Sequence, residues 1–215
     1  MRIRSIVYDF DGVICDSVSV KTEAFAEMYR QYGDDVVEKV VNYHHENGGI
    51  SRFEKFKYYE KAFFNKVIKE SEAREMGDLF SALAMQRVID AKYIDGAHEF
   101  IAQHHSNYLQ FICTGTPEVE IQEIARCKGI TSFFKAIYGA PQTKYTILTQ
   151  IMDQYNLQPK EVLFMGDAMT DYNAAKVTGV VFVGLLNEIT SFPEGTITIS
   201  NFKDPKLSRV LRNNL

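Results

Sequence analysis

The chain has 215 residues, of which 46% are hydrophobic and 24% are charged, and its formal net charge is −4. With 15 Phe and 12 Tyr residues, the composition is that of a folded protein and excludes a disordered chain. The mild acidic excess argues against a general nucleic-acid binder, and no apolar run approaches the roughly 18 residues of a membrane helix. We therefore expect no nucleic-acid partner and no membrane partner.

The three cysteines, Cys15, Cys113 and Cys127, are widely spaced and form no CxxC pair. This spacing argues against a cysteine zinc site and is typical of reduced cysteines in a cytosolic protein. The basic start of the sequence is followed by Asp9 and Asp11 rather than by a long apolar segment, so we expect no ordinary signal peptide. These features together predict a cytoplasmic protein.

Short apolar runs that are typical of buried strands recur along the chain, at residues 3–10, 109–113, 136–138, 162–165 and 180–183, with a weaker run at 196–199. Helical patterns separate most of them, at residues 118–128, 145–155 and 171–177. At the first of these helices, Thr116 and Pro117 suggest an N-cap and a proline in the first helical position. Alternating buried strands and helices predict an α/β fold with a Rossmann-like parallel sheet covered on both faces.

The segment from residue 18 to residue 90 differs, because it contains no run that resembles a strand. Its periodicity predicts four helices, near residues 21–32, 35–46, 51–68 and 72–90. We therefore expect two parts: an α/β core made of residues 1–17 and 91–215, and an all-helical insert of residues 18–90 that follows the first strand.

Polar residues follow the predicted strands, at the sheet edge where open parallel sheets bind ligands. They are Asp9 and Asp11, Thr114 and Gly115, Lys144, and Asp167 and Asp171. The carboxylates would repel one another unless a cation joined them, and hard oxygen ligands favour Mg²⁺. A threonine hydroxyl, backbone N–H groups and a lysine can hold phosphate oxygens. The set therefore predicts phosphoryl transfer assisted by Mg²⁺.

These residues stand in four motifs: Asp9-Phe10-Asp11-Gly12-Val13, Ile112-Cys113-Thr114-Gly115, Lys144, and Gly166-Asp167-Ala168-Met169-Thr170-Asp171. In order and spacing they resemble the four motifs of the haloacid dehalogenase-like (HAD) hydrolase superfamily. Each motif alone is weak evidence, but their ordered occurrence at strand ends is specific. The helical insert lies where the C1 cap occurs in the subfamily that contains phosphoglycolate phosphatase and β-phosphoglucomutase, and Asp16-Ser17 also fits that group.

This resemblance implies a role for each residue. Asp9 is the nucleophile that forms an aspartyl-phosphate, and Asp11 protonates the leaving oxygen and then activates water. Mg²⁺ is held by the Asp9 side chain, the Asp11 backbone carbonyl and Asp167. Asp171 either supports the metal or is only an acid in the first turn of a helix. The phosphoryl oxygens are held by Thr114, Gly115 and Lys144.

The helical insert, from here on called the cap, offers a second candidate site after Gly48-Gly49. Ser51 and Glu54 have the spacing of a capping box, which opens a helix at this point. Arg52 and Lys55 share a face of that helix, and either they contact an anionic or hydroxylated leaving group or they form a solvated face. Residues 51–69 carry six basic and two acidic residues, which suits a small phosphorylated metabolite, such as phosphoglycolate or a sugar phosphate.

Several alternatives stay open at this point. A phosphosugar mutase of the β-phosphoglucomutase type uses the same motifs, and a non-catalytic binding protein can share the fold. A phosphonate-cleaving relative needs a cap lysine as a Schiff-base nucleophile, and the sequence marks neither Lys55 nor Lys57 as buried. The adjacent pair His44-His45 has no i, i+4 chelating spacing, so we expect it at the surface or at a helix end. Monomer and dimer are equally compatible with the sequence.

Overall fold

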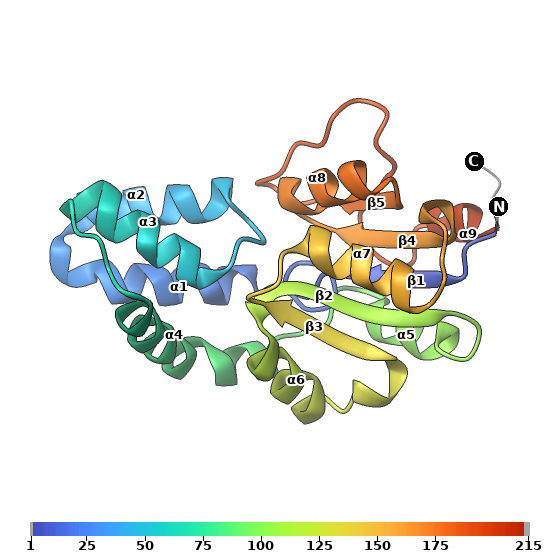
Figure 1. Cartoon of the computed structure of the whole chain (residues 1–215), viewed down its shortest axis with the longest axis horizontal. Coiled ribbons are helices and arrows are strands. Elements are labelled where there is room, and N and C mark those ends of the chain that lie inside the picture. The colour runs from blue at the N-terminus through green and yellow to red at the C-terminus, as the bar shows by residue number, and fades with distance from the viewer. Residues whose placement is uncertain (1, 213–215) are drawn as a thin grey trace.

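The computed structural model describes residues 2–212, and its centre is one six-stranded parallel sheet in the order β3-β2-β1-β4-β5-β6 (Figure 1). The strands are β1 (Ser5–Tyr8), β2 (Leu109–Pro117), β3 (Ala136–Ala140), β4 (Val162–Gly166), β5 (Val181–Leu185) and β6 (Thr198–Ile199). The first strand is central, because Val7 pairs with Phe111 of β2 on one side and with Phe164 of β4 on the other. The chain segments that follow β1, β2 and β4 therefore meet at the same edge.

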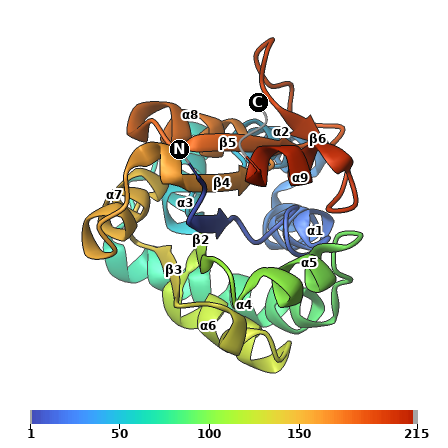
Figure 2. The same cartoon turned by 90° about the vertical axis from the view of Figure 1, so that its right-hand side faces the viewer.

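Helices cover both faces of the sheet, as Figure 2 shows. Ile6 and Tyr8 of β1 pack in the hydrophobic core beneath α5 (Ala97–His104), α6 (Glu118–Cys127) and α9 (Pro205–Leu211). Val7, which points the other way, packs beneath α7 (Lys144–Gln154) and α8 (Met169–Thr178). This alternation buries every residue of β1 and explains why the strand is a continuous apolar run.

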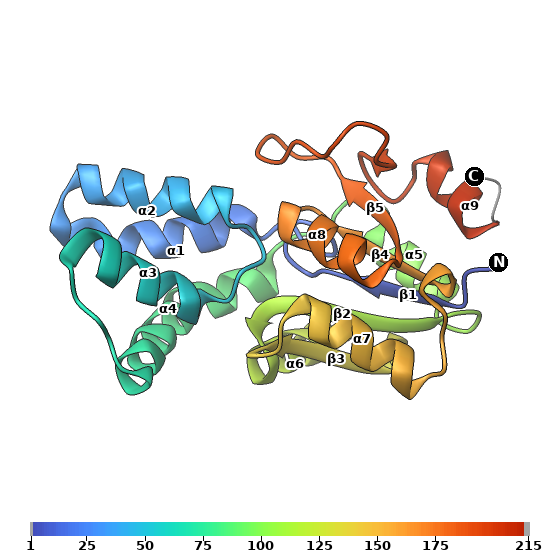
Figure 3. The same ribbon diagram turned by 45° about the horizontal axis from the view of Figure 1, so that its top comes forward.

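The cap consists of α1 (Val18–Tyr29), α2 (Asp34–Glu46), α3 (Arg52–Phe64) and α4 (Glu70–Asp90). These helices form a separate body at one end of the sheet (Figure 3). The cap has its own hydrophobic core, in which the rings of Phe25, Phe56 and Phe80 lie against one another. The sheet and the helical insert confirm the predicted fold class.

Local details differ from the sequence prediction in three places. The strand β2 runs on to Pro117, which is itself the N-cap residue of α6, so Thr116 does not cap the helix. The capping box at Ser51 does not form, because the Ser51 hydroxyl makes no capping hydrogen bond. The helices α5 and α9 complete one face of the sheet and were not predicted. None of the helices in residues 2–212 has the length and apolar character needed to span a membrane.

Candidate active site

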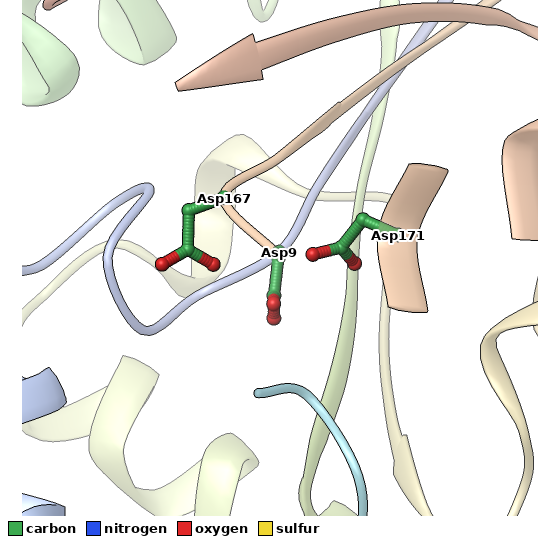
Figure 4. Close-up of side chains that lie close together, drawn as sticks. All are labelled: Asp9, Asp167 and Asp171. Atoms are coloured by element: carbon green, nitrogen blue, oxygen red, sulfur yellow. The ribbon is translucent and has the colours of Figure 1, made fainter. Parts of the chain in front are cut away.

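Three carboxylates from separate elements meet beyond the ends of β1 and β4. Asp9 follows β1, Asp167 follows β4, and Asp171 lies in the first turn of α8, and one oxygen of each lies within 4.8 Å of the others. Figure 4 shows Asp9 between the other two. Gly12 permits this approach, because it has a φ of +75° and a Cβ there would lie 2.2 Å from an Asp167 oxygen. The predicted convergence of these residues is thus present in the structure.

Lys144, the first residue of α7, neutralises part of this cluster. Its amine donates hydrogen bonds to Asp9 Oδ2 at 2.6 Å and to Asp171 Oδ1 at 2.5 Å. Burial by itself lowers the pKa of Lys144, but the two carboxylates outweigh burial and raise the pKa above its usual value. Lys144 is therefore a permanent cation next to Asp9.

One ammonium group does not neutralise three carboxylates. Burial, followed by repulsion from Asp9 and Asp171, raises the pKa of Asp167 well above its ordinary value. Burial also raises the pKa of Asp171 to about 6, in spite of the contact with Lys144. The site has an excess of buried negative charge and a set of hard oxygen donors, and both properties fit a divalent cation such as Mg²⁺.

The oxygens of the cluster differ in their availability. Asp171 is fully buried, and it accepts hydrogen bonds from Lys144 at Oδ1 and from the backbone N–H of Ala168 at Oδ2. Asp167 contacts Asn187, in the loop after β5, whose amide donates to the Asp167 carbonyl at 2.9 Å and to Oδ2 at 3.3 Å. Asn187 therefore holds Asp167 in place, a role that no motif in the sequence indicated.

Asp11 is not part of this cluster, and its carboxylate is held by other groups. It accepts hydrogen bonds from Ser17 Oγ at 2.6 Å and from Thr116 Oγ1 at 3.2 Å, and it forms an ion pair with Lys21 of α1. Burial alone raises the pKa of Asp11, but Lys21 and the two hydroxyl groups outweigh burial and lower it. Asp11 is therefore ionised and is held by both the core and the cap.

The cap loop at Gly48-Gly49 closes over the phosphate-binding residues predicted from the sequence. Thr170 donates a hydrogen bond to the Gly48 carbonyl at 2.6 Å. A Cβ on Gly49 would lie 2.7 Å from the Lys144 amine, and a Cβ on Gly115 would lie 2.4 Å from the Gly49 carbonyl oxygen. Only glycine permits such close packing of the loop, so these residues bring the cap directly against the core.

A cavity of about 80 Å³ lies between the cap and the core. The core contributes its catalytic candidates and the loop after β5, and the cap contributes α1, α2, α3 and α4. Among the residues predicted from the sequence, the lining includes Asp9, Asp11, Thr114, Gly115, Asp167, Arg52 and Lys55. The structure therefore brings most of the predicted core and cap residues to one space, whereas Lys144 lines an adjoining pocket with Thr114 and Gly115, and Asp171 lines neither.

Arg52 lines this cavity, but its charge is already compensated. Its guanidinium forms two hydrogen bonds with the Glu120 carboxylate of α6, one of them from Nη1 to Oε2 at 3.0 Å, and donates to Ser81 Oγ at 2.7 Å. It also lies 4.4 Å from the ring centroid of Phe80. Arg52 thus joins the cap to the core, a contact that the sequence did not reveal.

Lys55 is buried, with 2% of its surface exposed, whereas the side chain of the neighbouring Lys57 is 34% exposed. Its amine lies 2.8 Å from Nδ1 of His44 and 3.3 Å from the His44 carbonyl oxygen. Burial, followed by repulsion from Lys21, lowers the pKa of Lys55 to about 7. His44 lies in the last turn of α2, in agreement with the expected position at a helix end, and it is buried there rather than exposed at the surface.

Comparison with known proteins agrees with this geometry. Residues 6–185 match the family model described as haloacid dehalogenase-like hydrolase. The chain belongs to this family. It is 24% identical over 192 residues to a phosphoglycolate phosphatase of Vibrio vulnificus strain YJ016, which covers 86% of this chain and 84% of the relative. It is also 24% identical over 197 residues to a phosphoglycolate phosphatase of Pasteurella multocida strain Pm70, with 86% of each chain covered.

Solved structures share the fold. A β-phosphoglucomutase from Clostridium difficile superposes with a TM-score of 0.79 at 18% identity, covering 99% of this chain and 98% of the other. A predicted phosphoglycolate phosphatase from Haemophilus somnus 129pt gives a TM-score of 0.72 at 18% identity, with 100% and 99% covered. These matches confirm the resemblance inferred from the motifs and the expected enzyme class, a HAD hydrolase whose matched relatives are phosphatases.

Proposed function

We propose that this protein is a Mg²⁺-dependent phosphatase that hydrolyses a small phosphomonoester through an aspartyl-phosphate on Asp9. One observation carries the proposal: the carboxylates of Asp9 and Asp167, the Lys144 amine and the Thr114–Gly115 segment converge at adjacent strand ends beside one cavity. This set supplies a nucleophile, a cation site and an anion clamp, which are the parts that phosphoryl transfer requires.

In the first step, an Asp9 oxygen attacks the phosphorus atom and the bond from phosphorus to the ester oxygen breaks. The departing oxygen takes a proton from the Asp11 carboxyl group, so an alcohol leaves rather than an alkoxide. Asp11 is ionised in this structure, so this step requires that it gains a proton when the ester binds. Lys144 donates a hydrogen bond to Asp9 at 2.6 Å and compensates charge on the phosphoryl oxygens. Thr114 and Gly115 provide a hydroxyl and a backbone N–H for the same oxygens.

In the second step, Asp11 accepts a proton from water, and the water oxygen attacks the phosphorus of the aspartyl-phosphate. The bond from phosphorus to Asp9 breaks, and inorganic phosphate and the free carboxylate are formed. The structure holds Asp11 in its ionised form, paired with Lys21, and this is the form that accepts a proton. Because Lys21 of the cap forms the ion pair with Asp11, this step depends on a closed cap.

Mg²⁺ fits the carboxylate cluster, and we assign it to Asp9, Asp167 and the Asp11 backbone carbonyl. When bound, the ion offsets the repulsion between the carboxylates and the phosphoryl group. We give Asp171 a supporting role, because both of its oxygens accept hydrogen bonds from Lys144 and Ala168. The small cavity and the closing cap favour a small metabolite, phosphoglycolate or a sugar phosphate, in keeping with the matched phosphatases.

The test is phosphate release from a panel of small esters with and without Mg²⁺, using wild type, Asp9→Asn and Asp16→Asn. Asp16 is exposed and close in sequence, so its variant controls for a general loss of charge. We expect Mg²⁺-dependent release by wild type and Asp16→Asn, and loss of at least about 1,000-fold in Asp9→Asn with unchanged circular dichroism. Full activity of Asp9→Asn would refute the mechanism. A sugar-phosphate isomer as the main product would indicate the mutase instead.

One observation supports a second candidate, cleavage of a phosphonate that carries an aldehyde. The buried Lys55 amine, with its pKa near 7, has the properties of an imine-forming lysine, which the sequence did not indicate. Its nitrogen would join the carbonyl carbon with loss of water, and the electron pair of the carbon–phosphorus bond would pass to the imine as the phosphoryl group moves to Asp9. Borohydride trapping with phosphonoacetaldehyde followed by peptide mass analysis decides it: a stable adduct on Lys55 supports this candidate, and an unmodified Lys55 excludes it.

A further inference from the structure

The cap presents three cationic side chains to the cavity, and two of them already have carboxylate partners. Lys21 pairs with Asp11, and Arg52 pairs with Glu120. For Lys55, by contrast, no carboxylate of the described residues lies within 4.0 Å of the amine. Lys55 is thus a buried amine at the cavity with no carboxylate at ion-pair distance among residues 2–212, and the Asp11 charge acts on it only from farther away.

The surroundings of Lys55 make this lack of a partner costly. The amine lies 5.6 Å from the ring centroid of Phe25, and the cavity wall beside it includes Phe80. Burial in such a site disfavours the charged amine, and a buried charge needs a partner or loses its proton. A ligand with a negative charge can supply that partner.

The hydrogen bonds of Lys55 leave one direction open. An ammonium group has three donors, and two of them can be taken up by Nδ1 of His44 at 2.8 Å and by its carbonyl oxygen at 3.3 Å. His44 is itself neutral, because burial and then Lys55 lower its pKa well below the ordinary value. His44 therefore orients the amine without adding charge, and one N–H remains for the cavity.

We propose that Lys55, oriented by His44, binds a carboxylate on the alcohol part of the substrate. The inference rests on the proposed phosphatase function and narrows its substrate class to phosphate esters of small hydroxy acids. The ester is bound between two positive groups, with its phosphoryl group at Lys144 and its carboxylate at Lys55.

The test compares esters that differ only in this charge. The pairs are 2-phosphoglycolate with 2-hydroxyethyl phosphate, and 3-phosphoglycerate with glycerol 1-phosphate. The variants are Lys55→Met, which removes the amine, and the control Lys57→Met, which removes a partly exposed lysine of the same helix that does not line the cavity. We expect wild type and Lys57→Met to prefer a carboxylate ester at least about tenfold in kcat/KM, the contribution of one charged hydrogen bond.

In Lys55→Met, we expect this preference to vanish through a rise in KM for the carboxylate ester, while kcat/KM for the uncharged partner stays within about threefold of wild type. Equal hydrolysis of both esters by wild type would overturn the proposal. An equal loss of activity towards both esters in Lys55→Met would also overturn it, because a purely structural role gives that pattern.

Binding to Asp9→Asn, measured by titration calorimetry with the same esters, makes the outcome independent of turnover. A tenfold preference for the carboxylate ester that disappears in the double variant Asp9→Asn/Lys55→Met supports the proposal even if no ester is hydrolysed. Absence of any phosphate release by wild type would instead count against the phosphatase. Equal binding of the paired esters would count against the role of Lys55 alone.

Discussion

The ion pair between Arg52 and Glu120 joins the cap to the core. The burial of the two side chains determines how much folding stability is lost when the pair is broken. The two side chains are 4% and 10% exposed. Removing one member of such a pair leaves the other charge buried and costs about 3–5 kcal/mol. Arg52 keeps its contacts with Ser81 and with the ring of Phe80, so we take about 3 kcal/mol for Glu120→Gln.

For a chain of this length, about 3 kcal/mol corresponds to a fall in Tm of about 6–12 °C. The assay is thermal unfolding followed by far-ultraviolet circular dichroism. The matched control is Glu54→Gln, because Glu54 is 63% exposed and pairs with Lys57 on the same helix at 3.1 Å. Exposed pairs contribute about 0–1 kcal/mol, so this variant is expected to lose no more than about 4 °C.

The reasoning is refuted if Glu120→Gln and Glu54→Gln lower Tm by the same amount. A second variant tests the cause of the loss. Arg52→Met combined with Glu120→Leu replaces both charges by apolar groups, and we expect it to recover most of the stability because no unpaired charge is left. A double variant as unstable as Glu120→Gln would assign the loss to packing rather than to the unpaired charge.

Three further predictions concern the loop, the metal site and pH. Gly49→Ala places a methyl group 2.7 Å from the Lys144 amine, so kcat/KM should fall at least about 100-fold. Gly33→Ala, with a φ of +91° and no atom within 4 Å of the new Cβ, should keep full activity and lose about 1 kcal/mol of stability in urea unfolding. Asn187→Ala removes the two hydrogen bonds that Asn187 donates to Asp167, so the Mg²⁺ concentration for half-maximal activity should rise about tenfold in a titration. An unchanged concentration would contradict this role of Asn187. Because the pKa of Lys55 is lowered to about 7, the unfolded state binds more protons between pH 7 and 10.5, and stability should rise with pH in that window. Urea unfolding at pH 7.5 and 9.5 should show wild type gaining up to about 2.5 kcal/mol relative to Lys55→Met, and parallel curves would contradict the shift.

The core of the site was predictable because its residues lie near the carboxyl ends of strands of one parallel sheet, or directly after them. Asp9, Thr114 and Asp167 each come directly after a short apolar run, and the sheet edge brings such positions together regardless of their distance in sequence. The periodicity of residues 18–90 likewise contained enough information to predict four helices.

The contacts between cap and core were not predictable from local patterns. Thr116 precedes a proline and therefore resembles a helix cap, but β2 continues past it and its hydroxyl reaches Asp11. Lys21 and Glu120 make their contacts only once the cap is seated on the core.

Lys55 and Lys57 show a further limit of prediction from sequence. Aromatic residues of α3 occur on most faces of the helix, so the apolar pattern does not indicate which of the two lysines is buried.

The central position of β1 also bears on the order in which the chain folds. Ser5–Tyr8 are synthesised before their partners in β2, which begin at Leu109, so about 100 further residues are made before β1 can pair with β2. The cap is the intervening segment, and it can bury Phe25, Phe56 and Phe80 among its own helices. We therefore expect the cap to fold before β1 pairs with β2, and its folding to bring the two strands closer together. Pulsed hydrogen exchange during refolding should protect amides of α1–α4 before those of β1, and the reverse order would contradict this view.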